Sequence, residues 1–197
     1  MVLAGGASRR LGGALKGLEL VGGRRIIDRV VDALRPVTTE VVLAANDASS
    51  ANWLPGVVVL HDRIRDAGGL AGVEAALARG TDALVVAWDM PFVPVAVLED
   101  IVATANADDA DVVVPESNSP FGFEPFCAYY AARVAAELTA FLTSGSRAPR
   151  DFLARLKRAR RVPRQRIERI GDPGRLFLSV NSPQDLAAAR AAADSAQ

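Results

Sequence analysis

The chain opens with the stretch Met1-Val2-Leu3-Ala4-Gly5-Gly6-Ala7-Ser8-Arg9-Arg10-Leu11-Gly12-Gly13-Ala14-Leu15-Lys16. A short apolar run ends in two glycines, and polar, basic and glycine residues follow before the next periodic segment. Glycines let backbone N–H groups approach an anion because no Cβ stands in the way, and Arg10 and Lys16 add positive charge. The alternative is a Gly-rich turn with solvated arginines, which the added presence of Ser8 and Gly12 disfavours. The stretch therefore predicts a phosphate-binding loop directly after a first β-strand.

The spacing of this loop excludes two familiar phosphate-binding patterns. A Walker loop needs G-x-x-x-x-G-K-[ST], whereas Lys16 lies four positions after Gly12 and precedes Gly17, and G-x-G-x-x-G does not occur in this stretch. The remaining pattern, L-A-G-G-x-S-x-R-x-G-x-x-x-K, resembles the signature loop of the molybdenum cofactor guanylyltransferases, a family of nucleotidyltransferases. In that family the loop wraps the triphosphate and base of a nucleoside triphosphate. The resemblance implies nucleotide binding by Leu3, Ala4, Gly5, Gly6, Ser8, Gly12 and Lys16.

Length and composition indicate one compact α/β domain over residues 1–197. Half of the residues are hydrophobic, 23% are charged, and the net charge is zero, so no global field would recruit nucleic acid or an anionic membrane. One cysteine and one histidine exclude an internal disulfide and a multi-cysteine metal site. Neither a signal peptide nor a run of eighteen apolar residues is present. The sequence therefore predicts a cytoplasmic protein that binds neither membrane nor nucleic acid.

Apolar runs and helical repeats alternate along the chain, which predicts a doubly wound sheet. The runs at 41–45, 57–60 and 83–88 suit parallel strands covered on both faces, and residues 26–34 and 95–105 show helical spacing. We therefore expect a three-layer, mostly parallel, Rossmann-like nucleotidyltransferase fold. A segment resembling the family's x-P-x-x-A-x-Y strand, which ends at Tyr130, implies one antiparallel strand.

The C-terminal third is expected to hold two helices and a strand. A helix is predicted to run from Pro149 to Arg161, a strand from Leu176 to Asn181, and a further helix to begin at Ser182. The basic residues between 147 and 169 are expected to form a solvated face. Arg147 and Arg150 are the exceptions, because a related Gly-Glu-Arg-Arg stretch of the resembled family lies near its pterin substrate.

Polar residues that follow strand ends are the next candidates for the site, because ligands of open α/β sheets bind outside the carboxyl ends of the strands. Asp62 follows the third predicted strand, and a Gly-rich stretch then leads into a helix. This stretch resembles the family's G-P-L-A-G segment, which contacts the guanine base and ribose, although Gly69 stands where proline is usual. We accordingly expect nucleotide contacts from Asp62, Gly68, Leu70 and Gly72.

Asp89 follows the most apolar strand and precedes Pro91. A carboxylate in this place suits Mg²⁺, which binds one or two carboxylates together with phosphate oxygens and water; the alternative is a turn-forming aspartate. The sequence D-x-P-F resembles the family's metal-binding motif, with Trp88 where a small residue or cysteine is usual. Asn181 matches the second asparagine of the family's N-V-N-T-P segment, which lies near the metal, whereas Ser179 replaces the first asparagine.

The resemblance covers almost the whole chain in the family's order. It implies transfer of GMP from GTP to the terminal phosphate of molybdopterin or its molybdenum form, with release of pyrophosphate, Mg²⁺ as cofactor, and Lys16, Arg10 and Asp89 as catalytic residues. A molybdoenzyme or adaptor protein is a possible further partner. Leu15 stands where the family often has aspartate, which leaves two alternatives open. One is a related transferase that uses another nucleotide, such as CTP, or another acceptor; the cytidylyl branch of the family tends to have L-A-A-G where this chain has Leu3 to Gly6. The other is a catalytically idle nucleotide-binding module.

Overall fold

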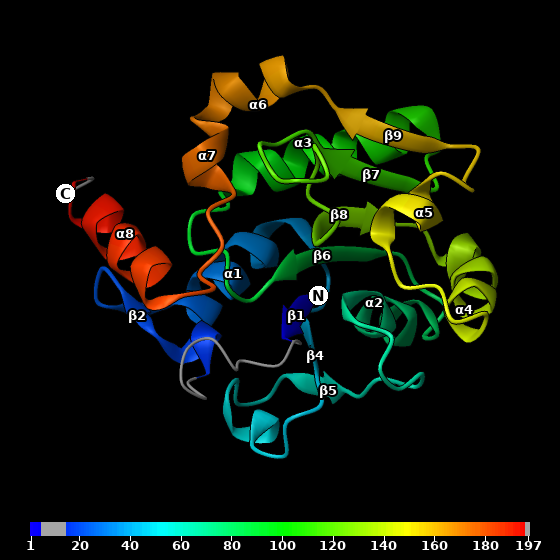
Figure 1. Ribbon diagram of the computed structural model, residues 1–197, viewed down its shortest axis with the longest axis horizontal. Coiled ribbons are helices and arrows are strands. Elements are labelled where there is room, and N and C mark those ends of the chain that lie inside the picture. Colours follow the sequence, from blue (N-terminus) through cyan, green and yellow to red (C-terminus); the bar gives the residue numbers. More distant parts are fainter. Residues whose placement is uncertain (5–14, 196–197) are drawn as a thin grey trace.

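The computed structural model describes residues 1–4 and 15–195, and within them seven strands form a central sheet (Figure 1). The strand order is β5-β4-β1-β6-β8-β7-β9. Strand β8 runs antiparallel to β6 and β7, and the other neighbours pair in parallel. This confirms the mostly parallel sheet with one antiparallel strand. The strands are β1 Val2–Ala4, β4 Val42–Ala45, β5 Val58–Leu60, β6 Ala83–Ala87, β7 Val112–Pro115, β8 Cys127–Tyr130 and β9 Ala159–Val162.

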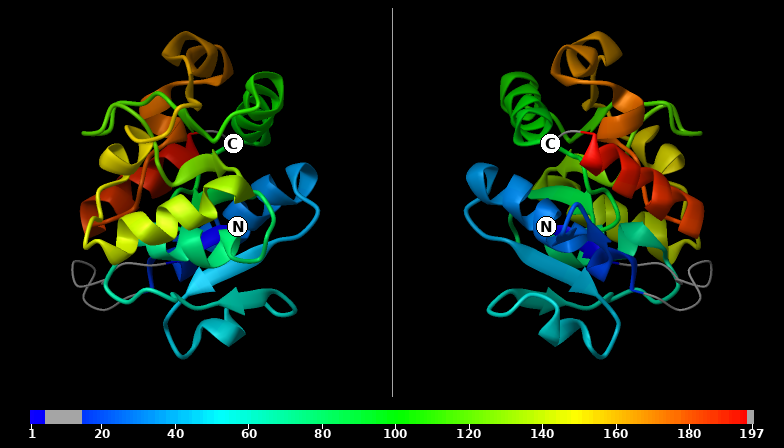
Figure 2. Two further views of the ribbon diagram at one scale, coloured as in Figure 1. Left: turned by 90° about the vertical axis from the view of Figure 1, so that its right-hand side faces the viewer. Right: turned by 90° about the vertical axis from the view of Figure 1, so that its left-hand side faces the viewer.

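Helices cover both faces of the sheet, as the side views in Figure 2 show. Helices α1 (Ile26–Leu34) and α3 (Val95–Asp108) pack on one face, and α2 (Gly69–Leu77) and α4 (Ala135–Thr143) pack on the other. Side chains of a strand alternate between the two resulting cores, and β1 places Val2 in the first and Leu3 in the second. Burial on both faces explains why β1, β4 and β6 are continuously apolar.

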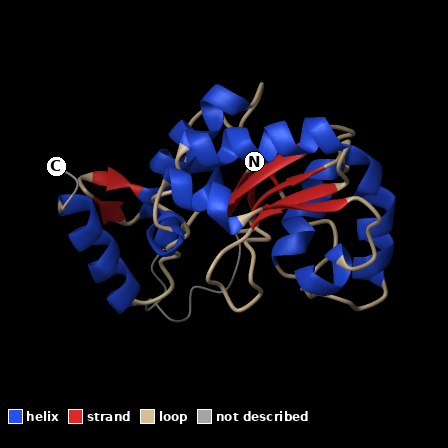
Figure 3. Cartoon of the chain, turned by 90° about the horizontal axis from the view of Figure 1, so that it is seen from above, coloured by secondary structure: helices blue, strands red, loops and turns tan. Residues whose placement is uncertain are grey.

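A smaller cluster lies at one end of the molecule, where α8 (Pro183–Asp194) packs beside the two-stranded β2–β3 ribbon (Figure 3). Strand β2 covers Leu20–Val21 and β3 covers Arg24–Arg25. Helix α8 begins with Ser182 as N-cap, Pro183 in its first turn and a capping box closed by Asp185, which confirms the predicted helix start. None of the helices in the described part of the chain has the length and apolar character needed to cross a membrane.

The helix predicted from Pro149 to Arg161 is wrong beyond its first turns. Helix α5 covers only Pro149–Leu153, and residues 159–162 form β9, which pairs in parallel with β7. Tertiary pairing along the exposed edge of β7 overrides the local helical pattern here. The basic residues predicted to form a solvated face are partly paired with acidic residues instead. Arg160 lies 3.4 Å from Asp108, and Arg158 pairs with Asp109 and Asp111.

The strand predicted from Leu176 to Asn181 is also wrong. Helix α7 covers Pro173–Leu176, and the side chain of Asp172 caps it by accepting hydrogen bonds from the backbone N–H groups of Gly174 and Arg175. The segment from Phe177 to Asn181 belongs to no strand of the described sheets. One of its backbone hydrogen bonds reaches the end of the sheet, where Val180 N–H donates to the Asp89 carbonyl at 2.9 Å. The pair Asp172-Pro173 was the feature of the sequence from which the start of this helix could have been predicted. Another short helix of this region, α6, covers Arg164–Ile170.

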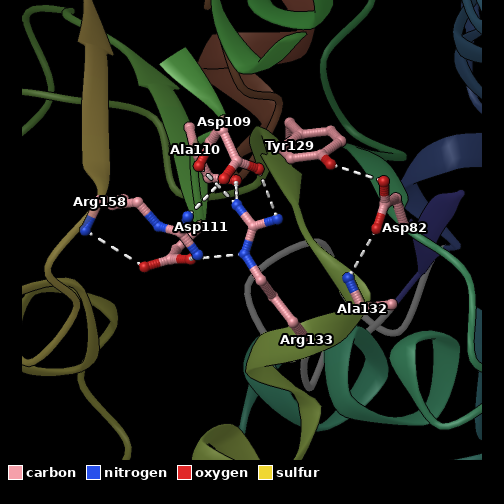
Figure 4. Close-up of polar contacts among 8 residues, drawn as sticks. All are labelled: Asp82, Asp109, Ala110, Asp111, Tyr129, Ala132, Arg133 and Arg158. Carbon is pink, nitrogen blue, oxygen red and sulfur yellow. Dashed lines mark hydrogen bonds and ion pairs between the residues drawn. The ribbon is translucent and has the colours of Figure 1, made fainter.

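Charged and polar groups at the amino edge of the sheet form an arginine–aspartate network and, beside it, a second set of contacts around Asp82 (Figure 4). The Asp111 carboxylate accepts hydrogen bonds from Arg133 Nε at 2.7 Å and from Arg158 Nη2 at 3.0 Å. Nearby, Tyr129 Oη donates to Asp82 at 2.6 Å. Burial alone would raise the pKa of Asp111, but the hydrogen bonds from Arg133 and Arg158 outweigh it and lower the pKa. The network ties β7, β8 and β9 together.

We expect Asp111→Asn to lower the free energy of unfolding by about 1–3 kcal/mol at neutral pH, because it removes the better buried of the two carboxylates, Asp109 and Asp111, that pair with Arg133 and Arg158. The folded pKa of Asp111 lies below the unfolded value of 3.8. Its stabilisation is therefore complete well above that pH and is lost as the pH falls through the folded pKa. Urea unfolding of both proteins at several pH values measures this. Asp108→Asn, which removes a half-exposed partner, is the control and should cost less than about 1 kcal/mol. Equal losses in the two variants, or a pH-independent difference, would contradict the assignment.

Candidate active site

The carboxyl edge of the sheet brings three predicted site residues together. Lys16 begins a short 3-10 turn, Lys16–Leu18, Asp89 follows β6, and Asn181 precedes α8. Lys16 Nζ donates a hydrogen bond to Asn181 Oδ1 at 2.6 Å and lies 3.9 Å from Asp89 Oδ2. The side chains of Lys16 and Asp89 are 14% and 13% exposed, so this ion pair is largely shielded from water. A charged contact in such a place is worth more than one on the surface.

Ser179 and Asp185 fix the orientation of Asn181. Asn181 Nδ2 donates to Ser179 Oγ at 2.8 Å, which leaves the amide oxygen facing Lys16. The Asn181 backbone N–H donates to Asp185 Oδ2 at 3.0 Å, so α8 holds the backbone as well. The Ser179 hydroxyl also opposes the rise that burial causes in the pKa of Asp89. Serine at position 179 thus retains a polar contact with Asn181.

Asp89 carries a charge that burial disfavours. Burial raises the pKa of its carboxyl group, and Lys16 and Ser179 oppose the rise. A cation beside this carboxylate would be stabilised by the same desolvated charge, and oxygen is the donor that Mg²⁺ prefers. Among residues 1–4 and 15–195 no group of three or more His, Cys, Asp or Glu side chains is arranged to hold a metal ion. The donor set therefore fits Mg²⁺ that takes its remaining ligands from phosphates and water, and it does not fit an all-protein metal cage.

A cavity of about 230 Å³ lies beside the start of α2, and we call it the α2 cavity. Asp62 on its wall accepts a hydrogen bond from Asn46 Nδ2 at 2.7 Å, while its backbone N–H donates to Asn46 Oδ1 at 2.9 Å. Burial raises the pKa of Asp62, and the bond from Asn46 opposes this. The cavity brings together five of the residues predicted to bind nucleotide. The lining consists of Leu3, Ala4, Ala44, Asn46, Asp62, Asp66, Gly68, Gly69 and Gly72.

Glycines at the start of α2 let the helix approach the sheet closely. Gly68 has a φ of +65°, which side-chain-bearing residues rarely adopt. A Cβ at Gly72 would lie 2.5 Å from Leu3 Cδ1, and one at Gly69 would lie 2.5 Å from Phe126 Cζ. Leu70, also predicted to bind nucleotide, is fully buried in the core and is not among the residues that line the α2 cavity.

Arg147 lies at the edge of the α2 cavity. Its Nε donates to the Asp66 carbonyl at 2.9 Å and its Nη1 to the Leu142 carbonyl at 2.6 Å. The guanidinium therefore clamps the loop before α2. Arg150 is exposed on α5. The predicted residues Gly5, Gly6, Ser8, Arg10 and Gly12 lie outside the described residues.

Sequence reasoning missed Asn46 and Glu124. Both lie at the carboxyl edge, Asn46 after β4 and Glu124 before β8, which runs antiparallel and so starts where its neighbours end. Ser117 Oγ donates to Glu124 Oε1 at 2.6 Å. Burial raises the pKa of Glu124, the hydrogen bonds of Ser117 and Ser119 oppose the rise, and the charge of Asp89 adds to it. The antiparallel direction of this strand was the signal from which Glu124 could have been predicted.

Residues 1–161 match the family model described as the MobA-like NTP transferase domain. The chain belongs to this family. A molybdenum cofactor guanylyltransferase of Desulfosudis oleivorans is 33% identical over 98% of this chain and 94% of its own length, and one of Cereibacter sphaeroides is 34% identical over 96% and 93%. The solved structure of molybdopterin-guanine dinucleotide biosynthesis protein A from Archaeoglobus fulgidus has 29% identity and a TM-score of 0.83, and the alignment covers 98% of this chain and 97% of that one. Both the family and the nucleotidyltransferase fold predicted from the sequence are confirmed.

We expect Gly72→Ala to lower the free energy of unfolding by about 1–3 kcal/mol, because its Cβ would meet Leu3 and the rigid Ala44 Cβ, 3.1 Å away. Urea unfolding measures this loss. Leu3→Ala opens the space that the new Cβ needs, so the double variant should lose less than the sum of the two single losses. Strict additivity would show that Gly72 is not confined by this contact.

Proposed function

We propose that this chain transfers GMP from GTP to the terminal phosphate of molybdopterin, or of its molybdenum form, and releases pyrophosphate. The observation that carries the proposal is the shielded cluster of Lys16, Asp89 and Asn181 at the carboxyl edge, adjoining the loop whose pattern predicts triphosphate binding. Family membership and the two relatives named molybdenum cofactor guanylyltransferase support the same reaction.

In this reaction a terminal phosphate oxygen of the acceptor attacks the α-phosphorus of GTP. The bond from that phosphorus to the oxygen bridging the α- and β-phosphates breaks, and the electron pair leaves with pyrophosphate. Such a displacement requires positioning and charge stabilisation rather than a covalent enzyme intermediate. Lys16 Nζ, held by Asn181, would donate to phosphate oxygens on which charge builds. Arg10 is proposed to assist it.

Asp89, with Asn181 beside it, would hold Mg²⁺ against the phosphates. Bound there, the ion supplies neutralisation of phosphate charge. We propose that the α2 cavity takes the guanosine part of GTP, with Asp62 orienting it and the backbone of Gly68 to Gly72 lining it. The remaining loop residues Gly5, Gly6, Ser8 and Gly12 are proposed to bind the triphosphate. Arg147 is committed to backbone carbonyls beside the α2 cavity, so it would support the guanosine side of the site rather than contact the pterin.

The test of the function is a panel of the four nucleoside triphosphates, assayed for pyrophosphate release with molybdopterin and Mg²⁺. We expect GTP to give the highest kcat/KM and to bind most tightly in calorimetry. A preference for CTP would reassign the chain to cytidylyl transfer. Nucleotide binding without pyrophosphate release from any of the four would identify an idle binding module.

Asp89→Asn should lower kcat at least about a hundredfold, because it removes the charge that holds the metal and several kcal/mol of transition-state stabilisation. The substitution preserves side-chain size, so thermal unfolding should change little. The measurement is turnover as Mg²⁺ is varied, with Asp32→Asn on the half-exposed face of α1 as the matched control. Turnover of Asp89→Asn within a few fold of wild type at limiting Mg²⁺ would place the metal elsewhere.

A further inference from the structure

A second cavity, of about 250 Å³, lies on the other flank of Asp89, and we call it the α7 cavity. The loop after β7 forms one wall, α7 forms another, and Ser179 joins it to the Lys16, Asp89 and Asn181 cluster. The lining residues are Asn118, Ser119, Glu124, Pro173, Gly174, Phe177 and Ser179.

Glu124 is the only acidic residue among them, and its setting differs from that of the carboxylates at the amino edge. Asp109 and Asp111 there are paired with arginines, whereas no arginine or lysine within the described ranges 1–4 and 15–195 lies within ion-pair distance of Glu124. Serine hydroxyls hold its carboxylate instead, with Ser117 Oγ at 2.6 Å. A half-buried carboxylate without a cation partner favours a ligand that brings N–H donors.

The two cavities lie on opposite sides of the reacting centre. The α2 cavity is lined from the β1 and β4 side of the sheet, and the α7 cavity is lined by segments next to β7 and β8. Strand β6, which leads into Asp89, lies between these pairs of strands. A transferase that joins two substrates through one phosphate needs such an arrangement, with one substrate reaching the centre from each side.

We infer that the Glu124 carboxylate in the α7 cavity recognises the pterin ring of the acceptor, through the neighbouring N–H donors of its 2-amino-4-oxopyrimidine edge. The inference rests on the proposed function, since it assigns the acceptor side of the same site. Phe177 and Pro173 give the cavity an apolar wall against which a flat ring packs. Ser179 lines the cavity and accepts a hydrogen bond from Asn181, which in turn bonds Lys16, so it marks the direction in which the terminal phosphate extends. Glu124 is thus a specificity-determining residue for the acceptor.

Guanine presents the same pair of N–H donors as pterin, so the experiment must separate the two substrates. Glu124→Gln keeps the size of the side chain and an acceptor for Ser117, but it places an NH₂ group where the ligand also donates. We expect KM for molybdopterin to rise about tenfold or more, with KM for GTP and kcat within about threefold of wild type. Glu99→Gln, an exposed residue on α3, makes the same change in charge and should leave every constant unchanged.

Binding of molybdopterin to the unmodified full chain, measured by quenching of pterin fluorescence, makes the outcomes distinguishable. Weaker binding in Glu124→Gln than in Glu99→Gln supports the inference, even if wild-type protein binds molybdopterin without transferring GMP and the proposed function fails. An unchanged KM and binding constant for molybdopterin in a folded Glu124→Gln protein would overturn it. A selective rise in KM for GTP would overturn it too, because Glu124 would then recognise guanine. Absence of molybdopterin binding to wild type would refute both proposals.

Discussion

The hydrogen bond from Lys16 to Asn181 is the contact on which the site depends. It joins two segments 165 positions apart, the end of the first loop and the start of α8, over the end of β6. Asn181 can accept this bond because Ser179 and Asp185 hold its amide nitrogen and its backbone in place. The ammonium group is thereby held 3.9 Å from Asp89 before any substrate binds. Preorganisation of this kind lowers the cost of aligning phosphates.

Two departures from the expected family pattern are accommodated by glycines. Trp88, where a small residue is usual, stacks on Trp53 with ring centroids 5.0 Å apart, and its ring lies against Gly17, where a Cβ would clash. Gly69, where proline is usual, faces the Phe126 ring, which occupies the space that a side chain there would need. Each large side chain thus lies over a residue without a Cβ. These pairs preserve the path of the backbone on both sides of the reacting centre.

The sequence was sufficient for the fold class and for the parts of the site that follow strand ends. Apolar runs identify buried strands directly. A polar residue that follows such a run lies at the carboxyl edge of the sheet, which is how Asp62 and Asp89 could be predicted. Strand β9 could not be predicted, because its four residues are strand-like only when paired with β7. Glu124 was missed for a different reason. Its place depends on the direction of β8, and direction is a property of the sheet rather than of the segment.

The antiparallel direction of β8 also explains why the carboxylates at the two edges of the sheet have different charged partners. At the amino edge, β8 ends beside β6 and β7, so Arg133, which follows it, reaches Asp111, and those charges neutralise one another. At the carboxyl edge the same strand begins, and it brings Glu124 near Asp89, where no arginine or lysine of residues 1–4 and 15–195 pairs with Glu124. Burial raises the pKa of both carboxyl groups, so the ionised form of each is disfavoured in the free protein. Under the proposed function, a divalent cation at Asp89 and N–H donors at Glu124 would relieve both costs.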